Sequence, residues 1–230
     1  MYKYKELIYL LIIYENYIMK VKKFTFNPFQ ENTYILYDKT HECIIIDPGC
    51  YEKNEREEIK KFISENNLEI KKIINTHCHI DHILGNQFIH EKWGANLYIH
   101  SLDMPLLENA KSTADLYGLK KYINSPNPIK FLKENQTIKF GVTELKILFT
   151  PGHAPGHICL YNKKNNILIA GDVIFQGSIG RTDLPGGNYN ILINSIKTKI
   201  LCLPDITQIY CGHGPSTNLK YEIEHNPFLQ

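Results

Sequence analysis

The chain has 230 residues, a formal net charge of +2 and a hydrophobic fraction of 43%. This length and composition predict one folded domain with a substantial core, and they exclude a largely disordered chain. The small net charge offers no basic footprint for DNA or RNA, so we expect no nucleic-acid partner.

The first 18 residues differ from the rest of the chain. An apolar run at 7–14 lies between Glu6 and Glu15. It is far shorter than the ~20 residues of a membrane helix, and no small-residue cleavage site of a signal peptide follows it. Met19 then opens a strand pattern. We therefore expect residues 1–18 to be an extension, which need not be part of the natural protein, and 19–230 to form a single domain without a membrane partner.

The first half alternates between strand and helix patterns. Strands are expected at 21–26, 33–37, 43–47, 70–75 and 97–100, and helices at 55–66 and 83–93. Segment 101–133 has a helical pattern followed by the breaker cluster Ser125-Pro126-Asn127-Pro128. We interpret this segment as an insertion that lies over the site, either as a lid or as simple packing.

The turn between strand 70–75 and helix 83–93 holds four candidate metal ligands in the pattern H-x-H-x-D-H. They are His77, His79, Asp81 and His82. The turn follows the carboxyl end of a strand, where open α/β sheets hold their ligands. Imidazole and carboxylate groups suit zinc, iron or manganese. A lone histidine is usually a core or surface residue, but four residues of ligand type at this spacing predict a metal centre.

The second half repeats the order of strands and then helices. Strands are expected at 137–140, 143–149, 158–161, 167–170 and 206–211, and a helix at 191–201. This order predicts two sheets packed together with helices outside.

Three more candidate ligands directly follow strands of the second half. They are His153, Asp172 and His213, each beside glycine or proline. Loops at strand ends can meet at one end of a scaffold. Five histidines and two aspartates are enough for two metals, and a carboxylate such as Asp172 can bridge ions ~3.5–4 Å apart.

Other residues near these loops have expected supporting roles. Asp47 ends a strand at the same edge and is expected to accept a hydrogen bond from a ligand histidine. His157 is expected to be a supporting imidazole rather than an eighth ligand. Cys78 should point away from the ligands. The six cysteines form no C-x-x-C pair, which favours free thiols in a reducing, cytoplasmic compartment.

The complete ligand set resembles that of the metallo-β-lactamase superfamily, over residues 19–230. The resemblance implies an αββα sandwich of class α/β (α+β). It also implies one metal held by His77, His79 and His153, a second held by Asp81, His82 and His213, and Asp172 between them.

Finer features resemble the short glyoxalase II-like hydrolases. These are the segment from Asp172 to Gly180-Arg181-Thr182-Asp183 and the ending Gly212-His213-Gly214-Pro215. Full-length hydroxyacylglutathione hydrolases carry a helical domain after the last ligand, and only seventeen residues follow His213 here. The carrier thiol therefore stays open. Arg181 is expected either to receive a substrate carboxylate or to pair with Asp183, and Tyr221 to help close the pocket.

The resemblance implies hydrolysis of a small-molecule thioester of the 2-hydroxyacyl (S-lactoyl) type to an acid and a thiol. A hydroxide bridging two divalent ions and held with Asp172 would be the nucleophile, with Asp81 as a further catalytic residue. Zinc is the first expectation, with iron and manganese as alternatives. A thiolate is a tolerable leaving group because its pKa is ~8.5.

Two alternatives remain open. Persulfide dioxygenases share the fold and the Gly-Arg-Thr-Asp segment, and they use one iron on two histidines and one aspartate, here His77, His153 and Asp172. The contexts of His157 and His213 favour the hydrolase. A non-catalytic metal-binding protein is the second alternative, against which the complete ligand set argues. Lactam hydrolysis is not expected, because no export signal was found.

Overall fold

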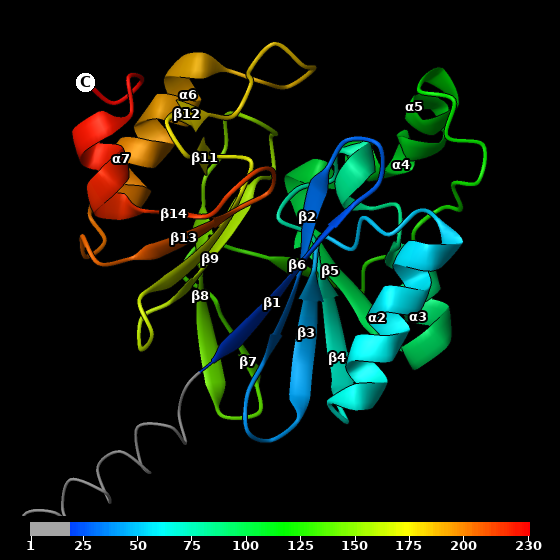
Figure 1. Ribbon diagram of the computed structural model, residues 1–230. Helices are drawn as coiled ribbons and strands as arrows, with labels where there is room; N and C mark the ends of the chain where they lie inside the picture. Colours follow the sequence, from blue (N-terminus) through cyan, green and yellow to red (C-terminus); the bar gives the residue numbers. More distant parts are fainter. Residues whose placement is uncertain (1–18) are drawn as a thin grey trace, which may run out of the picture.

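The computed structural model describes residues 19–230, so the expected extension at 1–18 lies outside the described residues. Two six-stranded sheets face each other in the middle of the molecule, and helices cover their outer faces (Figure 1). The αββα sandwich predicted from the sequence is confirmed.

The first sheet has the strand order β1-β2-β3-β4-β5-β6. Its strands are β1 Lys20–Phe26, β2 Glu31–Tyr37, β3 Glu42–Ile46, β4 Glu69–Ile74, β5 Asn96–His100 and β6 Lys130–Leu132. The pairs β1–β2 and β2–β3 are antiparallel, and the remaining pairs are parallel. Parallel neighbours need crossover connections. Helices α2 (Lys53–Glu65) and α3 (Asn86–Trp93) supply two of them and pack on the outer face of this sheet.

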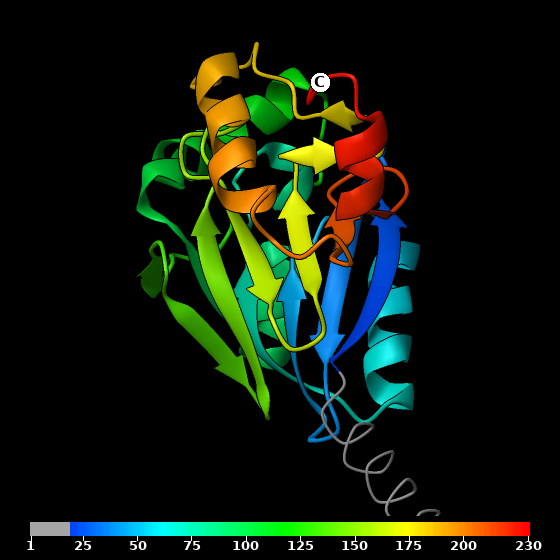
Figure 2. The ribbon, with the colours of Figure 1, turned by 90° about the vertical axis from the view of Figure 1, so that its left-hand side faces the viewer.

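The second sheet has the order β14-β13-β10-β9-β8-β7. Its strands are β7 Thr137–Phe140, β8 Thr143–Phe149, β9 Ile158–Asn162, β10 Ile167–Gly171, β13 Gln208–Cys211 and β14 Thr217–Asn218. Only β10–β13 is parallel among its pairs in the described chain. Helix α6 (Tyr189–Ser195), its π-helical continuation η3 (Ile196–Ile200) and helix α7 (Leu219–His225) cover its outer face (Figure 2).

The central strands β3, β9 and β10 are buried on both faces, which is why their sequences are mostly apolar. In β3, Ile44 and Ile46 point toward the second sheet and join Ile147 and Ile169 in one core cluster. Ile45, between them, points to the helices of the first sheet instead. Because side chains alternate between the two faces of a strand, β3 contributes to both core clusters.

Several expected elements differ from the observed ones at their ends. The helix expected at 83–93 begins at Asn86, because a short 3-10 turn, η1 (Ile80–His82), comes first. The helix expected at 191–201 begins at Tyr189, where Asn188 accepts a hydrogen bond from the Ile191 amide and caps it. The last long strand begins at Gln208 rather than at 206.

Some short elements were not predicted. They are β6, β14, α7 and the hairpin β11 (Ile174–Phe175) and β12 (Ser178–Ile179). The segment 101–133 contains a 3-10 turn, η2 (Ser101–Asp103), and helices α4 (Met104–Glu108) and α5 (Ala110–Leu116), before it ends in β6.

Five of the six cysteines are buried, and Cys202 is exposed. Burial raises the pKa of the Cys43 and Cys159 thiols to about 12. Cys78 lies in the core cluster of the first sheet, away from the candidate ligands as expected. Within residues 19–230, no helix is long and apolar enough to cross a membrane.

Candidate metal centre

All seven candidate ligands lie in loops that follow strands, at the same end of the two sheets. His77, His79, Asp81 and His82 follow β4, His153 follows β8, Asp172 follows β10 and His213 follows β13. The strands themselves are rigid because their backbone groups are paired in the sheets. The loops can therefore hold polar side chains in fixed places.

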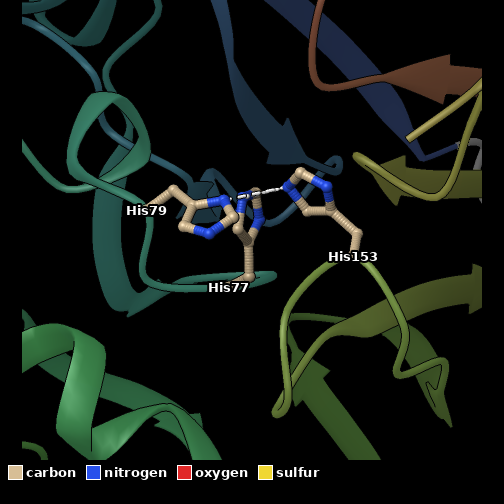
Figure 3. Close-up of side chains that lie close together, drawn as sticks. All are labelled: His77, His79 and His153. Carbon is tan, nitrogen blue, oxygen red and sulfur yellow. Dashed lines mark hydrogen bonds between the residues drawn. The ribbon is translucent and has the colours of Figure 1, made fainter. Parts of the chain in front are cut away.

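His77, His79 and His153 form the first group of ligand-type atoms. His153 Nε2 lies 2.9 Å from His79 Nδ1 and 3.2 Å from His77 Nε2. Figure 3 shows His77 and His79 on one turn and His153 reaching toward them from a separate loop. The turn follows β4 of the first sheet and the loop follows β8 of the second, so the three side chains meet only because the two sheets pack together.

Asp81, His82 and His213 form the second group. Asp81 Oδ2 lies 3.2 Å from His213 Nε2 and 3.6 Å from His82 Nε2. Asp172 lies between the two groups. One of its oxygens is 3.6 Å from His82 Nε2, and the other is 3.5 Å from the Nε2 atoms of both His153 and His213.

Two buried atoms at this point have no hydrogen-bond partner, His82 Nε2 and Asp172 Oδ1. An unpaired buried polar atom costs about 1–3 kcal/mol. The two atoms lie 3.6 Å apart, among the imidazole nitrogens and carboxylate oxygens of the two groups. Such a donor set fits divalent metal ions, whose binding would satisfy these atoms.

The outward nitrogen of three rings is held by a hydrogen bond. His153 Nδ1 donates to the Arg181 carbonyl oxygen (2.8 Å), His213 Nδ1 to the Phe29 carbonyl oxygen (3.1 Å) and His82 Nδ1 to Asp47 Oδ2 (3.1 Å). These acceptors place a proton on each Nδ1. In the neutral form of each ring, the Nε2 lone pair then points to the centre, as metal binding requires.

The two groups differ in charge. Burial lowers the pKa of His77 and His153 and lowers that of His79 to about 3, so these rings are neutral at pH 7. Burial acts in the same direction on His213, but Asp172 and Asp81 outweigh it and raise the pKa of His213 to about 9. The first group therefore presents neutral nitrogens, and the second combines imidazole with carboxylate.

Asp47 lies within reach of His77 and His82 as a third group of ligand-type atoms, but its carboxylate is engaged in hydrogen bonds, and His157 lies behind Asp172. Besides His82, Asp47 accepts hydrogen bonds from the amide and hydroxyl of Thr76, at 2.7 and 2.6 Å. His157 Nε2 accepts a hydrogen bond from the Asp172 amide at 3.0 Å, and its Nδ1 lies 3.1 Å from Thr150 Oγ1. His157 thus holds the backbone of a candidate ligand and is itself outside the groups of ligand-type atoms.

Arg181 and Tyr221 are not drawn into the centre. The Arg181 guanidinium donates two hydrogen bonds of 2.7 Å to the two oxygens of Asp183, so the ion-pair alternative describes this structure. The Tyr221 ring stacks on His225, one turn along α7, at 4.6 Å. Substrate contacts by either residue stay predictions.

Three buried residues that support the centre were missed by the sequence analysis. Asn27 donates to the Asp81 carbonyl oxygen, Asn32 donates to the carbonyl oxygens of the loop around His213, and Asp103 accepts from the amide of Cys78. Asn27 falls between the strands expected at 21–26 and 33–37 and had no expected role in the centre. No local pattern marks the other two, because each acts on a partner far away in the sequence.

Comparisons with known proteins agree with this geometry. The model of the metallo-beta-lactamase superfamily matches residues 26–213. The "Probable metallo-hydrolase YqgX" of Bacillus subtilis is 38% identical over 213 residues, which cover 92% of this chain and 98% of the relative. The "Hydroxyacylglutathione hydrolase GloC" of Haemophilus influenzae is 37% identical over 217 residues, with coverage of 92% and 98%.

Two crystal structures are similar over all of their length. The BLEG-1 B3 metallo-beta-lactamase superposes with a TM-score of 0.84 at 34% identity, covering 92% of this chain and 100% of its own. The protein TTHA1623 in a di-iron-bound form superposes with a TM-score of 0.81 at 35% identity, covering 91% and 100%.

Proposed function

The chain belongs to the metallo-beta-lactamase superfamily, and on that basis we propose that it is a dinuclear metal-dependent hydrolase of the glyoxalase II-like kind. Its proposed reaction is the cleavage of a 2-hydroxyacyl thioester of a small thiol into acid and thiol. The fold implies divalent metal ions, and zinc, iron and manganese all suit the donor set.

The position of Asp172 carries this proposal. Its carboxylate lies 3.5 Å from His153 of the first group and 3.5–3.6 Å from His213 and His82 of the second. A carboxylate shared between two sets of three ligands is the arrangement of a two-metal site. We assign His77, His79 and His153 to one ion, Asp81, His82 and His213 to the other, and Asp172 to both.

Bound divalent ions supply two chemical effects, a more acidic water molecule and a polarised substrate carbonyl. The chain supplies the rest. The carbonyl oxygens of Arg181 and Phe29 keep the rings of His153 and His213 in one orientation. The Asp81 carboxylate, 13% exposed, faces the centre and can accept the proton that an attacking water gives up. A thiolate can leave without a general acid, because thiols have a pKa of ~8.5.

The relative named hydroxyacylglutathione hydrolase supports a thioester substrate. The alignment covers 98% of that relative, so the similarity extends over nearly its whole length. The Arg181 guanidinium is already paired with Asp183, so we assign it no role in binding the carrier thiol. We therefore propose a small-molecule thioester as the ligand and leave the carrier thiol open.

The proposal is tested by metal content and thioester hydrolysis on one anaerobically purified sample. We expect about two metal ions per chain and cleavage of S-lactoylglutathione. Asp172→Ala should lower the turnover rate by more than about 100-fold, because it removes the ligand shared by both ions, and the loss of a residue that only orients a ligand already costs about 10–100-fold. Asp38→Ala, a buried aspartate in the turn after β2, is the matched control and should keep the activity.

One result would replace this function with the oxidative alternative. His77, His153 and Asp172 also lie together, with His153 Nε2 3.2 Å from His77 Nε2 and 3.5 Å from Asp172 Oδ2. One iron per chain, oxygen uptake with a persulfide and no thioester cleavage would overturn the hydrolase proposal.

Lactam hydrolysis is a second candidate, favoured by the similarity to a structure named as a B3 metallo-beta-lactamase. The same sample should therefore be assayed with a cephalosporin. Lactam cleavage faster than thioester cleavage would identify the ring amide as the preferred substrate.

A further inference from the structure

We propose that Asp103 is a positioning residue of the metal centre, whose carboxylate holds the turn carrying His77 and His79 against the loop carrying His153. The inference rests on the proposed function, because it assumes that these three histidines bind a metal. Asp103 belongs to segment 101–133 and is absent from the groups of ligand-type atoms.

The Asp103 side chain is completely buried and makes two unusual contacts. Asp103 is the N-cap residue of α4, a position where an aspartate normally accepts hydrogen bonds from the first amides of its own helix. It makes no such bond. Instead, Oδ2 accepts from the Cys78 amide at 2.9 Å, and Oδ1 accepts from the Gly156 amide at 2.5 Å.

These two amides belong to the two ligand-bearing loops. Cys78 lies between His77 and His79, and Gly156 lies three residues after His153. One carboxylate oxygen thus holds each loop, and the loops come from different sheets. The ring nitrogens of the three histidines lie within 4.8 Å of one another. A shift between the loops would therefore move His153 directly relative to the other two.

Gly156 shows that the contact is closely fitted. A Cβ atom at this position would lie 2.6 Å from Asp103 Oδ1 and 2.7 Å from the Asp103 amide nitrogen. No side chain fits there without displacing Asp103. Only a residue without Cβ lets the backbone of the His153 loop come this close to the carboxylate.

Asp103→Asn tests this role because an amide side chain has one acceptor oxygen where the carboxylate has two. Its NH2 group would face one of the two amides, and that contact would be lost. We titrate the metal-free protein with Co²⁺ alone and follow visible absorption under chelator competition. The wild type should bind two ions. In the variant, the affinity of the ion at His77, His79 and His153 should fall about 10–100-fold, as for other residues that orient ligands.

A second readout needs no metal. Hydrogen exchange at the amides of Cys78 and Gly156 should accelerate in metal-free Asp103→Asn, because one of these amides loses its acceptor. Gly156→Ala is the second variant, since it displaces Asp103 while leaving the carboxylate intact. Gly156→Ala should weaken the binding of the same ion, and it replaces Asp103→Asn in the test if that variant does not fold.

Asp38→Asn is the matched control. Asp38 is also buried, and its carboxylate also accepts from two backbone amides, those of Thr40 and Val142, at 2.9 and 2.8 Å. It contacts none of the candidate ligands. The control should bind both Co²⁺ ions with affinities within about twofold of the wild type, because its lost hydrogen bond lies outside the ligand loops.

The outcomes separate this inference from the function on which it rests. Unchanged Co²⁺ affinities and unchanged amide exchange in folded Asp103→Asn and Gly156→Ala would overturn the positioning role and leave the dinuclear site standing. Equal weakening in Asp38→Asn would also overturn it, because the effect would then reflect stability in general. A wild type that binds no Co²⁺ would overturn the proposed function itself.

Discussion

At the scale of single residues, the centre depends on backbone that lies very close to side chains. Gly212 stands directly before His213, and its amide donates to the Gly171 carbonyl oxygen at 2.7 Å. A Cβ atom at Gly212 would lie 2.0 Å from Asp172 Oδ1 and 2.9 Å from His82 Cε1. The chain therefore needs glycine here to leave space for two candidate ligands.

Gly212→Ala should accordingly reduce metal binding. The new methyl group must push Asp172 or His82 aside, so we expect fewer than one metal ion per chain by elemental analysis. Gly214→Ala is the control, since nothing lies within 4 Å of its Cβ position and its φ of +68° costs about 1–2 kcal/mol of backbone strain. It should keep both ions. Full metal content in Gly212→Ala would contradict the proposed place of Asp172.

The Asp38 carboxyl should make stability depend on pH in the acid range. Burial would raise its pKa, but hydrogen bonds from Thr40, Thr143 and Val142 outweigh that effect and lower it. Because the folded pKa lies below the unfolded value of ~3.9, the stabilisation is complete above that pH and is lost as the pH falls through the folded pKa.

Asp38→Asn removes this dependence. At pH 6 its free energy of unfolding should be about 1–3 kcal/mol below that of the wild type, the cost of one buried unsatisfied partner. Below pH 4 the difference should shrink. Urea unfolding of both proteins between pH 3 and pH 6 measures it, and a constant difference would show that the Asp38 pKa is the same in the folded and unfolded states.

At the scale of elements, the β1–β2 hairpin contacts both segments that carry the second group of candidate ligands. Asn27 donates from Nδ2 to the carbonyl oxygens of Gly49 and Asp81, both at 3.0 Å. Asn32 donates from Nδ2 to the carbonyl oxygens of Cys211 and Gly214, at 3.0 and 2.9 Å. One hairpin therefore holds the Asp81 turn at one end and the His213 loop at the other.

Asn32→Ala should loosen the His213 loop without changing the first group of histidines. Two carbonyl oxygens lose one donor each and keep another, Tyr34 Oη on Cys211 and Lys23 Nζ on Gly214. At about 0.5–1.5 kcal/mol per lost hydrogen bond, we expect a loss of about 1–3 kcal/mol in the free energy of unfolding. The affinity for the ion at Asp81, His82 and His213 should fall as well. Asn162→Ala, which removes a comparable bond from Asn162 Nδ2 to the Glu144 carbonyl oxygen, should lower stability only. Equal metal affinities in both variants would contradict the role of the hairpin.

Some elements could be predicted from the sequence because they carry a local signal. The β-branched run ending at Ile46 predicted a strand, and the pattern from His77 to His82 predicted the turn that carries four candidate ligands. The two-residue strands β11, β12 and β14 are too short to show any periodicity, and α7 is only seven residues long. The contacts of Asp103 and Asn32 join residues distant in sequence, so no single-sequence pattern could find them.

At the scale of the whole molecule, the candidate ligands connect the two sheets. Four of them follow the first sheet, and His153, Asp172 and His213 follow the second. An ion bound in either group would contact residues from both sides. Binding to the folded state alone stabilises it by about 2.7 kcal/mol when the free ion is at 100 times its dissociation constant.

Metal removal should therefore lower the melting temperature of the entire fold, not merely free a loop. We expect unfolding followed by circular dichroism to shift down on dialysis against a chelator and to recover when metal is restored. His153→Ala, which removes the second-sheet ligand of the first group, should show a smaller shift than the wild type. An unchanged melting temperature in the wild type would contradict a metal that links the sheets.

The burial of five cysteines has a practical consequence for single-molecule work. Because Cys202 is the exposed thiol, a maleimide dye should react at one place per native chain, in the turn after η3, which carries none of the seven candidate ligands. Unfolding would uncover the other five at once. The number of dyes per chain thus distinguishes a folded chain, which carries one, from an unfolded chain, which carries six.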